Sequence, residues 1–362
     1  MERPIIGISV GDPNGIGPEV IIKSLQHEGV AKLLTPVIYA SAKMMSASKR
    51  SLDLDFRFRV AEDEEDIQHG QVNLIECWEE PLELALGQST SVGGRAALLS
   101  LEESVAALKS KKIDALTTGP INKANMPKED FPFPGHTEFL TTRLEAEGSL
   151  MFLVNDELRV GLVTNHVPVA EVAGNINQKA ILAKLVTMDK TLRRDFAIEK
   201  PMIAVLALNP HAGDNGVIGD EDDKIIRPAI LEAKKKGMLV VGPYPADGFF
   251  GSGKHTKVDA ILAMYHDQGL VPFKALSFGQ GVNYTGGLPA IRTSPDHGTA
   301  YDIAGQGIAD HHSFQRALFL AQSAVLNRQR YDEDTANPLV IRPPVKKKPQ
   351  RGKPQAKGGK KK

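Results

Sequence analysis

Three histidines follow apolar runs that are typical of buried strands. His166 lies in VTNHVP, His211 in LNPHAG and His266 in MYHDQ. Neutral imidazoles in such positions can hold a catalytic divalent metal and leave coordination sites for substrate or water. Each histidine taken alone is more typical of a loop residue with ordinary hydrogen bonds, and no local signature such as HExxH joins them. The spacing by itself therefore leaves both interpretations open.

Two aspartates could assist such a site. Asp267 follows His266 directly, and Asp247 lies in PYPADGFF. A carboxylate near a metal can orient an imidazole or accept the proton of a substrate hydroxyl. Aspartates in segments of this kind also serve in turns. Asp247 and Asp267 are therefore candidate general bases.

A second set of residues could bind an anion. His136 and Thr137 begin GHTEFL, which predicts a helix whose N-terminal N–H groups favour negative charge. Lys274 and Arg292 add positive charge, and Asn283 offers a donor and an acceptor. A single lysine or arginine is usually solvated, but Arg292 stands between the apolar run LPAI and TSP. These five residues are candidate ligands of a phosphate or a carboxylate.

Polar, chemically capable segments recur where strand-like runs end. They are TTGPINK, TNHVPV, LNPHAGDNG, MYHDQG and GVNYTGG. Ligands of open α/β sheets bind at the carboxyl ends of strands, so we expect one assembled site. No GxGxxG follows a strand in a βαβ unit, and the common dinucleotide fingerprint is therefore missing.

The hydrophobic pattern predicts an α/β fold with a largely parallel sheet. The chain has 362 residues, enough for two domains or one bilobed unit. A first helix is expected from Pro18. The other expected helices cover residues 97–108, 178–192 and 312–328. Expected strands cover residues 4–10, 36–40, 113–118, 150–154, 159–164, 201–208, 258–264 and 281–285, with a hairpin formed by 150–154 and 159–164.

Composition narrows the class of protein. The single cysteine, Cys77, excludes an intrachain disulfide and cysteine-based metal sites. No apolar run reaches the roughly 18 residues that a membrane helix needs, and the N-terminus lacks the pattern of a signal peptide. We therefore expect a cytoplasmic protein.

The formal net charge of zero hides a basic C-terminus. Residues 346–362, KKKPQRGKPQAKGGKKK, contain nine basic residues and no acid, and the rest of the chain has 35 basic against 44 acidic residues. Such a segment has almost nothing apolar to bury and is expected to be disordered. No aromatic residue interleaves the lysines to stack on bases, so a solubilising or weakly polyanion-binding segment is expected rather than one that recognises nucleic acid specifically.

Two segments resemble isopropylmalate and isocitrate dehydrogenases. HGTAYDIAGQGIAD, residues 297–310, is similar to their adenosine-binding segment, and GDPNGIGPEV is similar to their N-terminal GDGIGPEV. The resemblance implies two α/β lobes with the active site in the cleft between them. It also implies a dinucleotide site that needs no GxGxxG, with His297 and Asp302 as candidate cofactor residues. The expected organisation is a bilobed unit over residues 1–330 with lobes interleaved in sequence, an extension over 331–345 and the disordered tail over 346–362.

The whole set of motifs resembles the 4-hydroxythreonine-4-phosphate dehydrogenase family over residues 4–330. In that family the metal ligands match His166, His211 and His266. The residues that match its substrate contacts are His136, Thr137, Lys274, Asn283 and Arg292. Two features depart from the family pattern: Asp214 stands where the family usually has a glutamate, and the Lys-rich tail lies outside it.

This resemblance implies a specific reaction. With NAD or NADP and a divalent metal (Zn, Co or Mg), 4-phosphooxy-L-threonine would be oxidised to 2-amino-3-oxo-4-phosphooxybutanoate, which loses CO₂ to give 3-amino-2-oxopropyl phosphate in pyridoxine 5'-phosphate biosynthesis. The family also implies a homodimer with its active site at the subunit boundary, where His266 could complete a site built mostly by the partner chain.

Three alternatives follow from the same sequence. A dehydrogenase for a four-carbon sugar-acid phosphate, threonate or erythronate 4-phosphate, would share these motifs. A phosphate acyltransferase can share the fold, but it leaves the three strand-end histidines and HGTAYDIAG unexplained. A nucleic-acid binder would rest on the basic tail alone.

Overall fold

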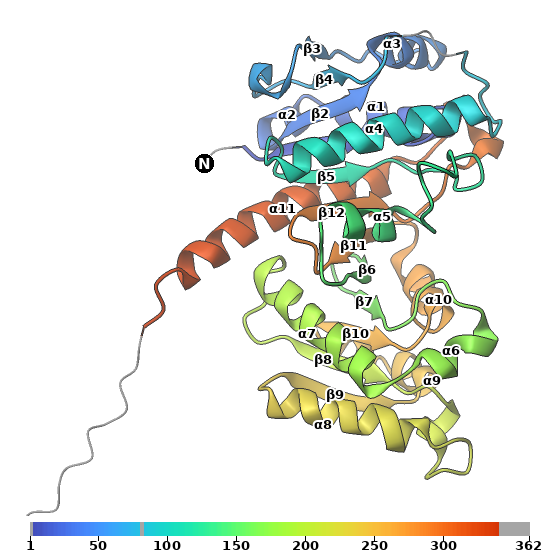
Figure 1. Cartoon of the computed structure of the whole chain (residues 1–362), viewed down its shortest axis with the longest axis vertical. Coiled ribbons are helices and arrows are strands. Elements are labelled where there is room, and N and C mark those ends of the chain that lie inside the picture. Colours follow the sequence, from blue (N-terminus) through green and yellow to red (C-terminus); the bar gives the residue numbers. More distant parts are fainter. Residues whose placement is uncertain (1–2, 80–82, 340–362) are drawn as a thin grey trace, which may run out of the picture.

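The computed structural model describes residues 3–79 and 83–339, and one sheet of twelve strands runs through this part of the chain (Figure 1). The strand order is β3-β4-β2-β1-β5-β12-β11-β6-β7-β10-β8-β9. The strands are β1 (Ile5–Ser9), β2 (Thr35–Ala40), β3 (Arg59–Ala61), β4 (Asn73–Glu76), β5 (Ala115–Thr118), β6 (Leu150–Val154), β7 (Arg159–Leu162), β8 (Met202–Leu206), β9 (Leu239–Tyr244), β10 (Ala260–Ala263), β11 (Val282–Gly286) and β12 (Ile291–Pro295).

The sheet has two parallel wings joined by an antiparallel centre. Strands β3, β4, β2, β1, β5 and β12 are mutually parallel, and so are β7, β10, β8 and β9. Between the wings, β11 pairs antiparallel with β12 and with β6, and β6 pairs antiparallel with β7. The expected largely parallel sheet and the expected hairpin, which is β6–β7, are both confirmed.

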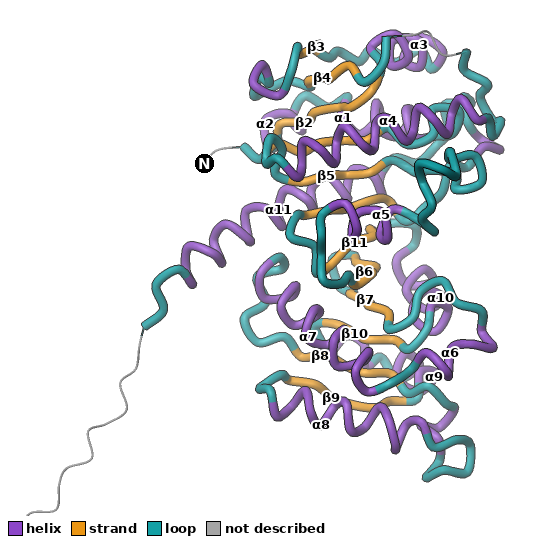
Figure 2. Tube along the Cα trace, viewed as in Figure 1, coloured by secondary structure: helices purple, strands orange, loops and turns teal. Residues whose placement is uncertain are grey.

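Helices cover both faces of this sheet (Figure 2). The apolar cores place α1, α3, α7, α8 and α11 on one face, while α4 and α5 cover the other face of the first wing and α9 and α10 cover the same face of the second wing. The helices are α1 (Gly17–Leu25), α2 (Gly29–Leu33), α3 (Ala42–Ser51), α4 (Ser91–Lys109), α5 (His136–Arg143), α6 (Val169–Asn175), α7 (Gln178–Arg194), α8 (Arg227–Lys235), α9 (Ala246–Gly251), α10 (His266–Ser277) and α11 (His312–Thr335).

Local sequence explains where several helices begin. Pro18 occupies the first turn of α1, where a missing N–H costs nothing. The Thr90 side chain accepts a hydrogen bond from Gly93 N at the start of α4, and the Asn177 side chain accepts one from Ala180 N at the start of α7. The expected helices are therefore confirmed, including the one that begins at His136.

The last helix of the described residues is longer than expected: α11 continues past residue 328 to Thr335. The two wings share one continuous sheet. The Lys-rich tail at residues 346–362 lies outside the described residues. No helix within residues 3–79 and 83–339 is long and apolar enough to cross a membrane.

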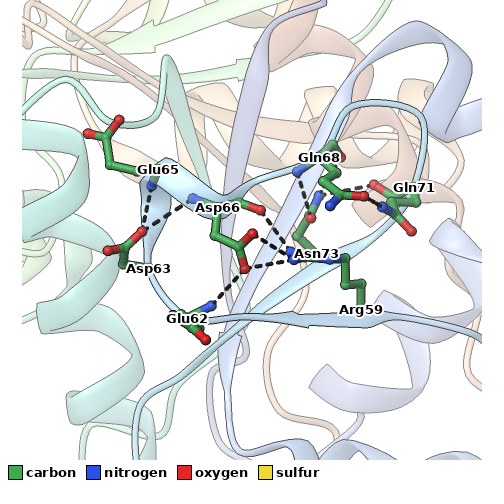
Figure 3. A network of polar contacts seen from close by, with 8 residues as sticks. All are labelled: Arg59, Glu62, Asp63, Glu65, Asp66, Gln68, Gln71 and Asn73. Carbon is green, nitrogen blue, oxygen red and sulfur yellow. Dashed lines mark hydrogen bonds and ion pairs between the residues drawn. The ribbon is translucent and has the colours of Figure 1, made fainter.

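A network of polar contacts around the β3–β4 connection stabilises the outer edge of the first wing (Figure 3). Arg59 Nη2 donates to both carboxylate oxygens of Asp66 at 2.6 and 2.7 Å, and Asn73 Nδ2 donates to the Gln68 carbonyl at 2.9 Å. β3 and β4 are short, and no expectation from the sequence included them. Side-chain contacts with the connecting loop therefore help to hold this edge.

Candidate active site

A cavity of about 260 Å³ opens over the centre of the sheet, between α5 and α10. Its floor is formed by β6, β11 and β12. On this face the pair α4 and α5 covers one wing and the pair α9 and α10 covers the other, and the cavity lies between the two pairs. Eight residues that the sequence predicted for the site line it: His136, Thr137, His166, His266, Lys274, Asn283, Arg292 and His297. Four others, His211, Asp247, Asp267 and Asp302, are not among the lining residues of the cavity.

The strand order explains how the histidine loops come together. β10 lies between β7 and β8 and is parallel to both, so the loops that carry His166, His266 and His211 leave the same edge of the sheet. The rings of His166 and His266 lie with their centroids 5.8 Å apart. Neighbouring parallel strands thus bring together residues one hundred positions apart in sequence.

The five strand-end segments do not all leave the same edge of the sheet. β5, which precedes TTGPINK, runs antiparallel to β7, because three antiparallel pairings separate the two wings. Thr118 and His166 nevertheless line the same cavity. The site therefore lies across the face of the central strands instead of along one row of carboxyl ends.

The chemistry of the histidines fits a divalent metal. His266 Nδ1 lies 2.8 Å from Asp267 Oδ1, a contact that orients the ring and leaves Nε2 for a ligand. Burial and the charge of Lys123 lower the pKa of His166, which favours the neutral, metal-binding form. His211 is exposed, in a loop where its own φ is 56°.

One chain does not gather all three histidines at ligation distance. Within residues 3–79 and 83–339, one group of three side chains has its donor atoms within 4.8 Å of one another. It consists of Asp310, His311 and His312, a surface cluster at the start of α11, and it does not include the three predicted histidines. The three histidines therefore share a donor chemistry and a sheet edge, and His166 and His266 line the cavity, whereas His211 is not among its lining residues.

Arg292 is a buried cation in the wall of the cavity. It is only 2% exposed, and Nη2 donates to Thr118 Oγ1 at 2.6 Å while Nη1 donates to Thr285 Oγ1 at 3.2 Å. No carboxylate lies within 4.0 Å of it among the described residues. Burial lowers the pKa of Arg292 to about 9, which leaves the guanidinium charged at neutral pH. A buried charge without a counterion is costly, so an anionic ligand is its natural partner.

The other candidate anion ligands also have unused hydrogen-bonding atoms. His136 Nε2 and Asn283 Oδ1 are buried and have no partner among the described residues. Burial, followed by the charges of Arg292 and Lys123, holds the pKa of His136 well below its usual value, so its ring is neutral. Lys274 Nζ lies 3.3 Å from the Asp296 carbonyl, to which it donates. These groups are positioned to be completed by a ligand.

Five polar residues of the cavity were missed at the level of sequence. They are Thr118, Lys123, Glu138, Ser294 and Asp296. Lys123 lies in TTGPINK and Glu138 in GHTEFL. Both motifs were noted in the sequence, but these two side chains were given no role. Their contribution becomes visible only where the loop after β5 and the first turn of α5 meet.

The two segments that resemble a dinucleotide site lie against each other. Ile16 N donates to the Thr299 carbonyl at 2.9 Å, and the Tyr301 hydroxyl donates to Asp12 Oδ2 at 2.6 Å. These contacts join GDPNGIGPEV, which follows β1, to the segment at residues 297–310, which follows β12. Asp302 is exposed within that segment.

The fold is of the dehydrogenase-like α/β class, and the wall of its cavity contains the buried cation of Arg292. A family model described as "Pyridoxal phosphate biosynthetic protein PdxA" matches residues 32–321. The chain belongs to this family.

Named relatives agree with this assignment. The chain is 45% identical to a 4-hydroxythreonine-4-phosphate dehydrogenase of Bacteroides thetaiotaomicron, over 92% of each chain. It is 40% identical to a D-threonate 4-phosphate dehydrogenase of Cupriavidus necator, over 88% of this chain and 95% of the relative. Among solved structures, a 4-hydroxythreonine-4-phosphate dehydrogenase of Klebsiella pneumoniae superposes with a TM-score of 0.78 at 33% identity, covering 89% of this chain and all of the other.

Proposed function

We propose that this chain is a metal-dependent NAD(P) dehydrogenase that oxidises 4-phosphooxy-L-threonine to 2-amino-3-oxo-4-phosphooxybutanoate, which decarboxylates to 3-amino-2-oxopropyl phosphate. The observation that carries the proposal is the buried, unpaired guanidinium of Arg292 beside His136 and Asn283. A phosphorylated amino acid supplies anions that can pair with this guanidinium. Membership of the pyridoxal phosphate biosynthetic family supports the same substrate.

The residues of the chain would bind and orient the substrate. Lys274, Asn283 and Arg292, together with His136 and Thr137 at the start of α5, would hold its phosphate and carboxylate. Such contacts, remote from the reacting carbon, fix its position relative to the cofactor. The burial of Arg292 also keeps bulk water away from its donors.

His166, His211 and His266 would hold the divalent metal (Zn, Co or Mg). When bound, the metal supplies Lewis acidity that lowers the pKa of the substrate hydroxyl, and the nicotinamide of NAD or NADP accepts the hydride. Asp267 is positioned to orient the His266 ring through its 2.8 Å contact. Asp267 and Asp247 remain our candidates for the base that takes the hydroxyl proton, and His297 and Asp302 remain our candidates for cofactor contacts.

We propose that the active enzyme is a homodimer with the active site at the subunit boundary. Helix α10, which carries His266 and Lys274, exposes the apolar side chains Val271 and Leu276, and Phe278 follows the helix with 85% of its surface exposed. An apolar surface beside a catalytic cavity is typical of an interface between subunits. A partner seated there would close the site next to His266. We also propose a cytoplasmic location, where small phosphorylated metabolites and nicotinamide cofactors are found.

A second candidate substrate is a sugar-acid phosphate such as threonate 4-phosphate. The D-threonate 4-phosphate dehydrogenase of Cupriavidus necator, 40% identical to this chain, favours it. Both substrates carry a phosphate and a carboxylate, so Arg292 and Lys274 would serve either. They differ in the group at C2, which is an ammonium in one and a hydroxyl in the other.

The test is a comparison of both substrates with the purified full chain. Reduced nicotinamide should accumulate with 4-phosphooxy-L-threonine when a divalent metal is present, and a chelator should stop the reaction. His211→Ala should lose bound metal and turnover while keeping its fold. The matched control is His27→Ala, which changes an exposed histidine far from His211 in the sequence and should keep both bound metal and turnover. Full activity of His211→Ala in the presence of chelator would exclude the metal mechanism.

A further inference from the structure

Two carboxylates line a cavity that is otherwise rich in positive charge. Glu138 and Asp296 face it together with Lys123, Lys274 and Arg292. A cavity built only to hold phosphate and carboxylate groups gains nothing from a carboxylate in its wall, because like charges repel. The presence of an acid there needs its own explanation.

Glu138 lacks the hydrogen-bond partner that a buried carboxylate normally has. It is the third residue of α5, half-buried, and its Oε2 is buried without any partner among the described residues. Gly135, one turn earlier, allows Glu138 and Lys123 to share the space beside it: a Cβ at that position would lie 3.4 Å from Glu138 Oε2 and 3.6 Å from Lys123 Nζ. An acceptor left unsatisfied in this way costs free energy unless a ligand donates to it.

Nearby cations surround Glu138 without forming an ion pair with it. Burial lowers the pKa of Arg292 and the pKa of Lys184, and the negative charge of Glu138 partly opposes this lowering in both. No cationic nitrogen lies within 4.0 Å of Glu138 among residues 3–79 and 83–339. Arg292 instead donates to threonine hydroxyls, and Lys184 Nζ donates to the Ser149 carbonyl at 2.5 Å. The carboxylate is therefore available to a cation that comes from outside the chain.

Asp296 does not share this property. Its carboxylate lies beside Lys274 and His297, whose charges oppose the rise in its pKa that burial causes. It also packs against Gly281, where a Cβ would come within 2.5 Å of Asp296 Oδ2. Asp296 thus has cationic neighbours of its own, and it offers a matched comparison within the same cavity.

We propose that Glu138 recognises the C2 ammonium of the substrate and so selects an amino-acid phosphate over the corresponding hydroxy-acid phosphate. This inference rests on the proposed function and names the specificity residue of that site. The substrate carries two kinds of anion and one cation, and the wall presents basic groups with one unpaired acid. A hydrogen bond from an ammonium to a carboxylate is charge-assisted, roughly twice as strong as a neutral one, so a neutral C2 hydroxyl is a poor replacement.

The experiment measures binding of two compounds that differ only at C2. Calorimetric titration of the metal-loaded full chain, without nicotinamide so that no turnover occurs, gives the Kd for 4-phosphooxy-L-threonine and for the matching threonate 4-phosphate. Glu138→Gln keeps the size and one acceptor but removes the charge. We expect it to reduce the preference for the amino compound about 10- to 100-fold, chiefly by weakening that compound. Asp296→Asn removes the same charge from the other carboxylate and should leave the preference within about 3-fold of the wild type.

Other outcomes would overturn the proposal. If Glu138→Gln changes the affinity of both compounds by the same factor, Glu138 acts only by offsetting the charge of the cavity. If Asp296→Asn lowers the preference as much as Glu138→Gln does, the effect is one of net charge and not of recognition. If the wild type binds neither compound, the proposed function fails first and the inference falls with it. Should Glu138→Gln not fold, Glu138→Asp retains the charge but withdraws it by one methylene; an unchanged preference in that variant would also contradict the proposal.

Discussion

The guanidinium of Arg292 on β12 donates two hydrogen bonds to Thr118 Oγ1 on the neighbouring strand β5, through Nη2 at 2.6 Å and Nε at 3.2 Å. These strands are parallel neighbours, with Arg292 paired to Leu116 in register. The threonine fixes the orientation of the guanidinium but does not neutralise it. Free N–H donors and an uncompensated charge therefore remain directed at the cavity.

Replacing Arg292 with Met should separate ligand binding from stability. We expect phosphate affinity to fall about 10- to 100-fold, because a charge-assisted hydrogen-bond donor is lost. The free energy of unfolding should change little or rise, because an apolar side chain of similar volume removes a buried unpaired charge. Thermal unfolding with and without inorganic phosphate measures both quantities, since a bound anion raises the Tm of the wild type. An equal phosphate-induced rise in the variant would contradict the assignment of Arg292 to the anion site.

The low pKa of His136 predicts a pH dependence of stability. In the unfolded chain this histidine takes up a proton below about pH 6.5, whereas burial keeps it neutral in the folded chain well below that pH. The free energy of unfolding should therefore be highest above pH 6.5 and fall as the pH decreases below it, by up to about 1.4 kcal/mol per pH unit for one proton. Denaturant unfolding of His136→Asn between pH 7 and pH 5 should show a shallower decline than the wild type. Parallel curves for the two proteins would show that His136 is not the group responsible.

The buried contact between Asp195 and Arg328 should matter far more than ion pairs on the surface. Asp195 is 3% exposed and accepts hydrogen bonds from Arg328 at 2.8 and 2.9 Å and from the Tyr284 hydroxyl at 2.7 Å. Asp195→Ala should cost about 3–5 kcal/mol, because it leaves a largely buried arginine uncompensated. Glu145→Gln, which breaks the exposed pair with Lys109, should leave the free energy of unfolding nearly unchanged, because water screens this pair. Urea unfolding of both variants gives the comparison, and similar small losses would argue against a structural role for the Asp195 network.

Gly94 should be required for the close approach of α4 to the loop that carries Lys123. A Cβ at Gly94 would lie 1.9 Å from the backbone oxygen of Asn125, which cannot move as a side chain can. We expect Gly94→Ala to destabilise the protein by about 1–3 kcal/mol or more, despite the better helix propensity of alanine. The control is Gly174→Ala on α6, where nothing lies within 4 Å and a gain of about 0.5–1 kcal/mol is expected. Melting temperatures of the two variants that shift in the same direction would contradict the proposed packing.

Much of the fold could be predicted from local patterns. The strand–helix alternation, the β6–β7 hairpin and the helix that begins at His136 all follow from residues that are close in sequence. Helix α10 was not expected, because Gly269 and Pro272 interrupt its pattern and residue 266 reads as a loop position. It forms because α10 packs on β7 and β10, a tertiary contact that overrides weak propensity.

Some residues of the candidate site could be predicted from the sequence, and others could be found only in the structure. Residue types and motifs were sufficient to select His166, His266, Lys274, Asn283 and Arg292, all of which line one cavity. The sequence could not place Glu138 or Asp296 in the wall of the cavity. It also did not show that His211, Asp247, Asp267 and Asp302 lie outside that wall.

By itself, then, the sequence determined the chemistry of the site: which imidazoles, amides and cations the protein can bring to a ligand. Only the tertiary structure decided that three antiparallel pairings reverse the strand direction between the two wings, and that the cavity lies over the central strands. It also decided that, within the described part of the chain, neither Arg292 nor Glu138 forms an ion pair, because charge pairing depends on distances between residues that are far apart in the chain.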